Sequence, residues 1–181
     1  MKIMIASDLH GSASACRQLL ACFEREQPEK LLLLGDLLYH GPRNDLTQEY
    51  DPKKVAEMLN SIQDKIICVR GNCDTEVDQA MLDFPIMAEY HILELEDKII
   101  FATHGHRFQQ GNALILEPGD IVVQGHTHIA GKENRGHYYC LNPGSAALPR
   151  SNSKAGYLLL EDNIFYWKTL SGEVYGEWEI E

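Results

Sequence analysis

The chain has 181 residues, of which 44% are apolar and 24% are charged, a balance that is typical of globular proteins and excludes a disordered chain. This length supports one hydrophobic core, and we expect residues 1–181 to form a single domain. Sixteen basic and 27 acidic side chains give a formal net charge of −11, which argues against a groove for long nucleic acid.

The chain shows no sign of export or membrane insertion. Its longest uninterrupted aliphatic run, residues 31–34, is far too short to span a bilayer. A charge at Asp8 interrupts the first apolar run too early for a signal peptide. Five cysteines at irregular spacings do not suggest a disulfide framework. These features predict a cytoplasmic protein without membrane partners.

The first half of the chain predicts the order β-α-β-α-β. Apolar runs at residues 2–7, 30–35 and 66–70 are expected to be buried strands. One helix is expected after Ser12, which can cap it, and another after Asp51, which is followed by a proline at the first helical position. This alternation is typical of a parallel sheet with right-handed crossovers.

The second half changes to short strands separated by turns. Residues 92–95 and 98–103 flank an acidic turn and predict a hairpin. Further strands are expected at residues 121–124, 138–141, 156–160, 164–170 and 174–180. Together the two halves predict a mixed α/β domain with two packed sheets and helices outside.

Five polar clusters fall where these strands are expected to end. They are Asp8-Leu9-His10, Gly35-Asp36, Gly71-Asn72-Cys73-Asp74, Thr103-His104-Gly105-His106 and Gly125-His126-Thr127-His128. Ligands bind beyond the carboxyl ends of strands in α/β sheets, and each cluster offers oxygen or imidazole ligands. Taken singly, each cluster is more often a turn, a helix cap or a pair of strand residues. Five of them in one chain, each at the end of an expected strand, favour a metal site.

The order of these clusters resembles the signature of the calcineurin-like metallophosphoesterases. Longer phrases at residues 41–44, 69–74 and 142–145 are similar to those of the small bacterial YfcE-type phosphodiesterases. The resemblance extends from Asp8 to about Pro149. It implies a four-layer α-β-β-α sandwich with two mixed β-sheets, and the number of expected strands agrees with that fold.

The resemblance implies a site for two divalent metal ions. The first ion would be held by Asp8, His10 and His128, the second by Asn72, His104 and His126, and Asp36 would bridge both. Two metals about 3.5–4 Å apart need such a bridge, and a carboxylate has two oxygens to supply it. A ligand set of nitrogen and oxygen suits manganese, iron, cobalt, nickel or zinc, and manganese is the expected metal.

These ions imply hydrolysis of a small phosphoester, most simply a phosphodiester. A hydroxide that bridges the two ions would attack phosphorus in line with the leaving group, and the metals would neutralise charge in the transition state. The resemblance also implies alternatives. One is a phosphomonoesterase; another is an inactive scaffold such as the retromer subunit, which has this fold. Self-association of the chain is left open.

Three further residues are candidates for catalysis. Many relatives carry a histidine where this chain has Cys73, and that histidine is thought to protonate the leaving group. A thiol can donate a proton but carries no positive charge, so Cys73 either acts as the acid or only fills space. Either Asp74 or backbone carbonyls are expected to orient the ligating imidazoles. Arg43 either clamps a phosphate oxygen or is an exposed loop residue.

Overall fold

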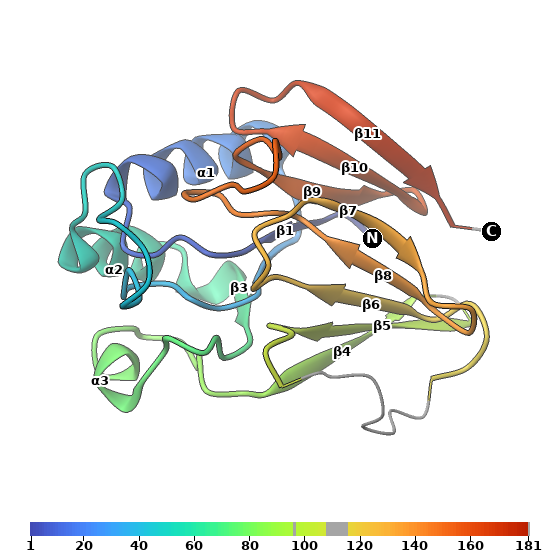
Figure 1. The fold of residues 1–181 in the computed structure, drawn as a ribbon, viewed down its shortest axis with the longest axis horizontal. Coiled ribbons are helices and arrows are strands. Elements are labelled where there is room, and N and C mark those ends of the chain that lie inside the picture. Colours follow the sequence, from blue (N-terminus) through green and yellow to red (C-terminus); the bar gives the residue numbers. More distant parts are fainter. Residues whose placement is uncertain (96, 108–115, 181) are drawn as a thin grey trace.

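The computed structural model describes residues 1–95, 97–107 and 116–180. Two mixed β-sheets pack face to face, and helices lie outside the first of them (Figure 1). In the first sheet the strand order is β11-β10-β9-β1-β2-β3. Its strands are β1 (Ile3–Ala6), β2 (Lys30–Leu33), β3 (Ile66–Cys68), β9 (Gly156–Glu161), β10 (Ile164–Thr169) and β11 (Val174–Glu179).

The second sheet has the order β4-β5-β6-β8-β7. Its strands are β4 (Tyr90–Leu95), β5 (Lys98–Thr103), β6 (Ile121–Gln124), β7 (Gly131–Asn134) and β8 (Tyr139–Asn142). Within this sheet β5, β6 and β8 are parallel neighbours, as are β1, β2 and β3 in the first sheet. Parallel neighbours bring the loops beyond their carboxyl ends to one edge of each sheet.

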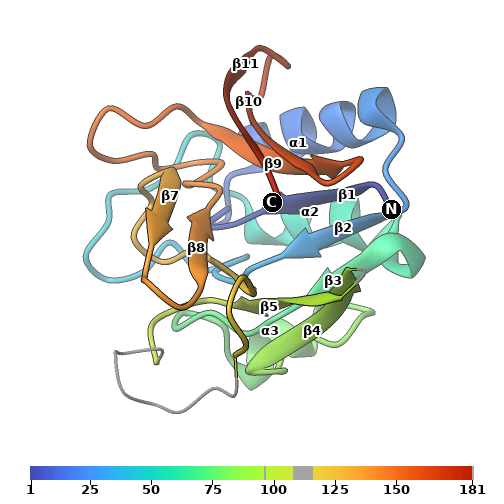
Figure 2. The ribbon, with the colours of Figure 1, turned by 90° about the vertical axis from the view of Figure 1, so that its right-hand side faces the viewer.

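Helices α1 (Ala13–Glu26) and α2 (Pro52–Asn60) cover one face of β1 and β2 (Figure 2). Ser12 caps α1 by accepting a hydrogen bond from the Ala15 N–H at 3.1 Å. Asp51 caps α2 in the same way, and Pro52 stands at its first turn. Both caps satisfy N–H groups that the helix itself cannot satisfy.

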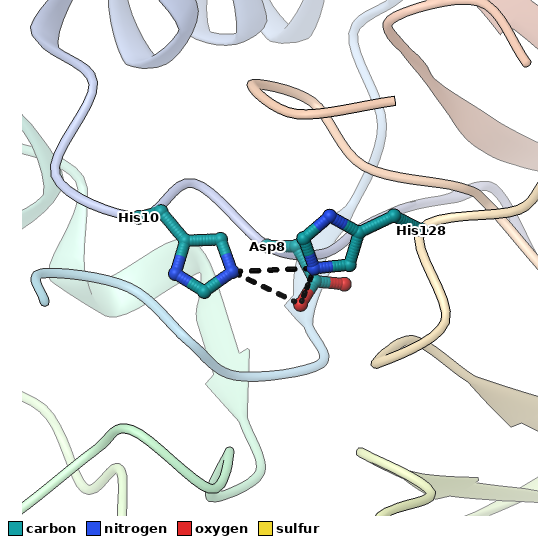
Figure 3. Close-up of side chains that lie close together, drawn as sticks. All are labelled: Asp8, His10 and His128. Carbon is teal, nitrogen blue, oxygen red and sulfur yellow. Dashed lines mark hydrogen bonds and ion pairs between the residues drawn. The ribbon is translucent and has the colours of Figure 1, made fainter. Parts of the chain in front are cut away.

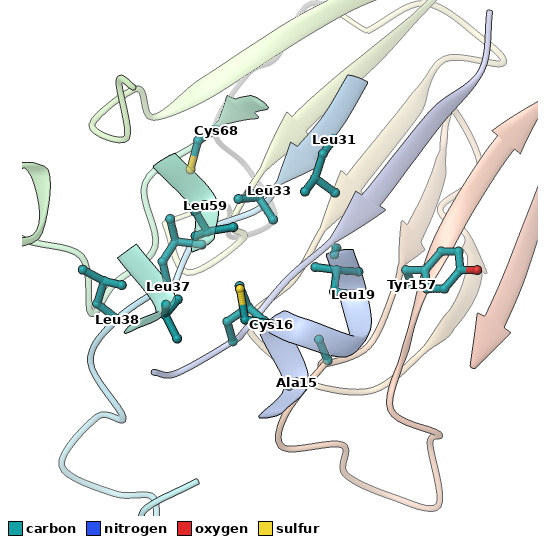
Figure 4. Packing of buried hydrophobic residues seen from close by; sticks show 14 of the residues in the cluster. Ala15, Cys16, Leu19, Leu31, Leu33, Leu37, Leu38, Leu59, Cys68 and Tyr157 are labelled. Carbon is teal, nitrogen blue, oxygen red and sulfur yellow. The ribbon is translucent and has the colours of Figure 1, made fainter. Parts of the chain in front are cut away.

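The alternation of side chains along β1 and β2 divides the apolar residues between two cores. Met4, Leu31 and Leu33 point toward the helices, where they pack with Leu19 and Leu59 (Figure 4). Residues on the other face of the same strands, such as Ile5 and Leu32, enter the core between the two sheets. Burial on both faces explains why these strands read as continuous apolar runs.

The architecture confirms the prediction of two mixed sheets. Each strand expected from the sequence is present, with ends that differ by at most two residues, and the expected hairpin is the antiparallel pair β4–β5. Strand β7 was not expected, because its four residues are all exposed and polar and give no apolar alternation. The short helix α3 (Glu76–Gln79) was also missed, although Thr75 and Asp78 form a capping box that marks its start.

No helix in the described part of the chain is long and apolar enough to cross a membrane. The 3-10 helix η1 (Gln63–Lys65) and α3 are the shortest of the described helices.

Candidate metal centre

The polar clusters that follow β1, β2, β3, β5 and β6 meet at one place beyond the carboxyl ends of these strands. A cavity of about 310 Å³ opens there, at the lower end of the range for small-molecule sites. Its lining includes five of the expected ligands: His10, Asp36, Asn72, His126 and His128. The other two, Asp8 and His104, are fully buried in contact with these residues. The structure therefore brings all seven sequence-predicted ligands into one site.

Asp8, His10 and His128 form the first group of candidate ligands. The Nε2 atoms of His10 and His128 lie 3.3 Å apart, and both point toward one carboxylate oxygen of Asp8 (Figure 3). That oxygen, Oδ1, is 3.6 Å from His10 Nε2 and 3.2 Å from His128 Nε2. All three atoms lie within 4.8 Å of one another, which is the spacing of ligands around a single ion.

Backbone carbonyls fix the orientation of three imidazole rings. The Nδ1–H group of His10 donates to the Tyr39 carbonyl at 2.9 Å, and that of His128 donates to the Leu148 carbonyl at 2.7 Å. A carbonyl oxygen can only accept, so each Nδ1 carries a proton and the neutral ring presents the lone pair of Nε2 to the site. This is the outer contact that metal-ligating histidines need to hold their tautomer.

His104 has the same arrangement in the second group of ligands. Its Nδ1–H donates to the Leu34 carbonyl at 2.6 Å, and its Nε2 lies 3.1 Å from Asn72 Oδ1. The ring of His126 lies beside that of His104, with centroids 5.1 Å apart and planes at 66°. Asn72, His104 and His126 thus surround a second position with nitrogen and oxygen atoms.

Asp36 lies between the two groups. Its Oδ2 atom is 3.7 Å from His10 Nε2 and 3.5 Å from His104 Nε2. Its other oxygen, Oδ1, accepts a hydrogen bond from the Cys73 backbone N–H at 2.8 Å. One carboxylate oxygen therefore faces both groups while the second holds the side chain in place. The position is the one that a bridging ligand requires.

The buried carboxylates Asp8 and Asp36 give the site a negative charge that a neighbouring positive charge must offset. Burial raises the pKa of Asp8, but contacts with His10 and His128 outweigh it and hold the pKa below its usual range. Burial lowers the pKa of His104, but the hydrogen bond and charge of Asp36 outweigh burial and raise it to about 9. Without a cation, protons on the rings must offset the buried carboxylates.

Neighbouring imidazoles shift in the opposite direction. Burial and the charge of His104 lower the pKa of His126. The same two causes, together with His126, lower the pKa of His106 to about 4. These rings stay neutral at pH 7, so the ring of His126 keeps a lone pair with which it can bind a cation.

Five of the seven candidate ligands adopt left-handed backbone conformations. Their φ angles are 59° (Asp8), 46° (His10), 57° (Asp36), 66° (His126) and 62° (His128). Residues other than glycine adopt this region at a cost of order 1–3 kcal/mol each. The sharp turns aim successive side chains into one small volume, and such strain is characteristic of functional sites.

Two glycines let the backbone approach the central carboxylates. A Cβ atom at Gly71 would overlap Asp36 Oδ1 and the Asp36 backbone nitrogen, and one at Gly125 would overlap the Ser7 hydroxyl next to Asp8. Gly125 is followed by the His126 backbone N–H, which donates to Asp8 Oδ2 at 3.1 Å. Gly71 of the Gly-Asn motif and Gly125 of the Gly-His motif are therefore required because a larger residue would overlap the neighbouring atoms.

The segment 142–145 ties the loops together. Asn142 Nδ2 donates to the Gly125 carbonyl at 2.8 Å and to Thr127 Oγ1 at 3.0 Å. Ser145 Oγ donates to the Asp8 carbonyl at 2.8 Å. These bonds link the loop after β1 to the loop after β6, which explains the sequence phrase Asn-Pro-Gly-Ser close to the ligands.

Asp74 has a different place from the one expected. Its buried carboxylate accepts hydrogen bonds from the backbone N–H groups of Asp36 (2.8 Å), Leu37 (2.9 Å) and Gly71 (2.7 Å). Burial raises the pKa of Asp74 despite these bonds. The structure therefore gives Asp74 the task of shaping the loop under Asp36, whereas backbone carbonyls orient His10, His104 and His128.

Cys73 and Arg43 both line the cavity. Cys73 is half-buried, and its Sγ accepts a hydrogen bond from Asn72 Nδ2 at 3.2 Å. Burial and the charge of Asp36 raise the pKa of the Cys73 thiol to about 12, so it stays protonated at neutral pH. Two lining residues were missed as site residues, Asn44 and Arg150, because no sequence motif places the segment around residue 150 beside the segment around residue 44.

The donor set fits divalent cations. Asp8 Oδ1 is buried and has no hydrogen-bond partner among the described residues, and two imidazole lone pairs face it. Such a convergence of electron-rich atoms is unfavourable unless a cation or protons occupy the space between them. Neutral nitrogen and carboxylate or amide oxygen are the ligands of manganese, iron, cobalt, nickel and zinc.

Comparison with known proteins gives consistent matches. Residues 1–163 match the model of the calcineurin-like phosphoesterase superfamily domain. The chain is 46% identical over 164 residues to the phosphodiesterase YfcE of Escherichia coli K12, covering 91% of this chain and 89% of that protein. The structure of the phosphoesterase YfcE from E. coli superposes with a TM-score of 0.95 at 42% identity and 100% coverage of both chains.

More distant structures share the fold. Zinc-bound Vps29 from Entamoeba histolytica matches with a TM-score of 0.65 at 20% identity over the full length of both chains. At this level of identity the similarity concerns the fold alone.

Proposed function

This chain belongs to the calcineurin-like phosphoesterase superfamily, and we propose that it hydrolyses small phosphodiesters with two divalent cations held at the candidate metal centre. The observation that carries this proposal is the position of Asp36 Oδ2, which lies within 3.7 Å of an imidazole nitrogen from each ligand group. One carboxylate oxygen between two sets of ligands is the arrangement that a two-metal phosphoesterase needs.

Asp8, His10 and His128 would hold one cation and Asn72, His104 and His126 the other, with Asp36 shared. Bound cations would supply a deprotonated water as nucleophile and would offset the negative charge that develops on the phosphoryl oxygens. We propose manganese as the metal; the sequence admits zinc, iron, cobalt and nickel as well.

The protein's own residues keep this arrangement ready before substrate binds. Three backbone carbonyls hold the rings of His10, His104 and His128 with Nε2 toward the cavity. Asp74 holds the backbone of Asp36 and Gly71, so the shared carboxylate has little freedom to turn away. Such fixed ligands cost no reorganisation during the reaction.

Arg43 and Cys73 face the substrate side of the cavity. We assign Arg43 to a phosphate oxygen, for which its planar fork is suited. Cys73 contributes at most a neutral proton donor, since its thiol stays protonated at neutral pH. Poor assistance to the leaving group favours diesters whose leaving groups are already activated.

The scaffold alternative is not favoured. An inactive scaffold has no reason to keep seven ligands, five of them in strained backbone conformations, because buried polar groups without partners are costly. The five cysteines are free, which supports a reducing compartment such as the cytoplasm. Self-association stays a prediction.

Reconstitution of activity tests the function. Chelator-treated protein should be inactive toward bis-p-nitrophenyl phosphate, and addition of manganese should restore turnover, with the other candidate metals compared at equal concentration. A matched series of p-nitrophenyl monoesters and diesters then gives the preference. We expect diester turnover to exceed monoester turnover; metal-independent hydrolysis, or hydrolysis of monoesters alone, would refute the assignment.

A further inference from the structure

Two arginines stand at the rim of the metal cavity without a carboxylate partner. Arg43 and Arg150 both line the cavity, and both are exposed, whereas Asp8 and Asp36 at its floor are at most 2% exposed. In residues 1–95, 97–107 and 116–180, no carboxylate oxygen lies within 4.0 Å of either guanidinium.

Among the described residues Arg70 also has no ion pair with a carboxylate, but it donates to the Asp74 carbonyl at 3.2 Å and does not line the cavity. The net charge is −11, and four other arginines each have a glutamate within ion-pair distance. Those arginines are Arg17, Arg25, Arg107 and Arg135. Two free guanidinium groups at one cavity are therefore available for an anion from solution.

Arg150 is held in place without losing its charge. Its Nη2 donates to Asn44 Oδ1 at 2.9 Å, and Asn44 Nδ2 in turn donates to the His40 carbonyl at 2.8 Å. The Arg150 backbone N–H is bound to the His128 carbonyl at 3.0 Å. An amide oxygen orients the guanidinium but leaves its positive charge uncompensated, and the remaining N–H groups have no acceptor among the described residues.

We propose that Arg150, oriented by Asn44 and assisted by Arg43, forms a subsite for a second phosphate group of the substrate. This inference rests on the proposed function. Two divalent cations more than offset the charges of Asp8 and Asp36, so a singly charged diester is already neutralised at the floor of the cavity. The cationic rim then serves a further anion, and the preferred substrates are diesters that also carry a phosphomonoester.

A pair of substrates with the same leaving group tests this subsite. One is the p-nitrophenyl ester of thymidine 5′-phosphate, and the other is the same ester with an additional 3′-phosphate. We expect the added phosphate to lower KM by about 10- to 100-fold with kcat nearly unchanged, since charge-assisted hydrogen bonds add ground-state and transition-state binding equally.

Substitutions locate the effect. Arg150→Ala should bring the KM ratio of the two substrates close to one, Arg150→Lys should leave an intermediate ratio because charge stays but the fork is lost, and Arg43→Ala should lower the ratio in part. Lys154→Ala is the matched control: it removes a positive charge from a nearby exposed residue that pairs with Glu173 and does not line the cavity. The control should keep the wild-type ratio.

Two kinetic results would overturn the proposal. One is an equal KM for both substrates in the wild type. The other is a loss of kcat in Arg150→Ala that affects both substrates alike while the KM ratio persists, which would show that Arg150 only links two loops. Calorimetric binding of thymidine 3′,5′-bisphosphate against thymidine 5′-phosphate tests the subsite even if no diester is hydrolysed. Absence of hydrolysis would refute the proposed function, whereas equal binding in calorimetry would refute the subsite.

Discussion

The Nε2 atoms of His10 and His128 lie 3.3 Å apart although both rings donate their Nδ1–H groups to backbone carbonyls. Two neutral rings in this state direct lone pairs at each other and at Asp8 Oδ1, which is repulsive in the absence of a cation. The hydrogen bonds to the backbone therefore hold the two rings in a repulsive geometry, which becomes favourable only when an ion, or protons in its place, lies between them.

Metal and protons compete for His104. The stability of the metal-free protein and the stabilisation added by metal should therefore change in opposite directions with pH. The folded-state pKa of His104 is about 9, above the ordinary value of about 6.5. Its proton therefore contributes stability to the metal-free protein fully below about pH 6.5, and this contribution is lost as pH rises through about 9. A bound metal needs the deprotonated ring, so the stabilisation by metal should grow over the same interval.

Thermal unfolding between pH 6 and 9, with chelator or with manganese, measures both slopes. We expect Tm to fall with pH in chelator and the Tm gain from manganese to rise. His104→Gln should flatten both slopes, whereas His91→Gln, at a half-buried position on β4, should change neither. A metal-free Tm that rises from pH 6.5 to 9 would be incompatible with a protonated His104.

Gly71→Ala should disturb the shared carboxylate. The new methyl group would overlap Asp36 Oδ1 and the Asp36 backbone nitrogen, so the loop must move. We expect a loss of about 1–3 kcal/mol in the free energy of unfolding, as for other overpacked sites, and weaker metal binding. Gly176→Ala is the control, because its Cβ would meet Trp167 at 3.6 Å, an ordinary contact. Equal denaturation midpoints for the two variants would contradict this role of Gly71.

Cys73 predicts a steep dependence of rate on the leaving group. A neutral thiol with a pKa of about 12 gives little assistance to a departing alkoxide, so aryl diesters should react well and simple alkyl diesters poorly. Cys73→His should flatten this dependence and accelerate alkyl esters by up to ~10²–10⁴-fold, the range of positioned general acids.

A series of diesters with graded leaving-group pKa values, run at fixed metal, makes the comparison. Cys73→Ser serves as the control of similar size. A shallow wild-type slope that steepens in Cys73→Ser would show that the thiol is itself the acid. Coincident slopes in all three proteins would show that this position takes no part in proton transfer.

The acidic chain should be a poor nuclease on long duplexes. A net charge of −11 repels a polyanion, and phosphate contacts by lysine and arginine supply most of the affinity in duplex binding. We expect turnover of small diesters to exceed that of duplex DNA at physiological salt. Comparable rates in one assay, with the same metal, would show that a local basic surface overrides the net charge.

The convergence of the candidate ligands could be predicted from the sequence, whereas the rim around them could not. Candidate ligands such as Asp8 and His104 follow apolar strands, so the pattern predicts their position beyond the carboxyl ends of strands. Arg150 and Asn44 are 106 positions apart and meet only through loop conformation. The position of Asp74 under Asp36 was likewise not predictable. The sequence alone does not show whether an aspartate accepts hydrogen bonds from backbone amides or from an imidazole.

Buried strands could likewise be predicted from the sequence, whereas an exposed strand could not. Buried strands such as β1 and β9 were predicted because burial on one or both faces leaves an apolar pattern. Strand β7 pairs only with β8 and is fully exposed, so hydrogen bonds to its neighbour rather than apolar burial define it. The local pattern of apolar and polar residues does not indicate such pairing.

The shared role of Asp36 is the central claim, and Asp36→Asn tests it most directly. Asparagine keeps the size of the side chain and an oxygen for the Cys73 N–H, but it loses the charge that faces both ligand groups. Bound metal should be measured by elemental analysis and turnover with bis-p-nitrophenyl phosphate, with circular dichroism to confirm folding. We expect two metal equivalents in the wild type, fewer in the folded variant, and a loss of turnover of more than about 100-fold. Two retained equivalents together with full turnover would contradict a shared carboxylate at this site.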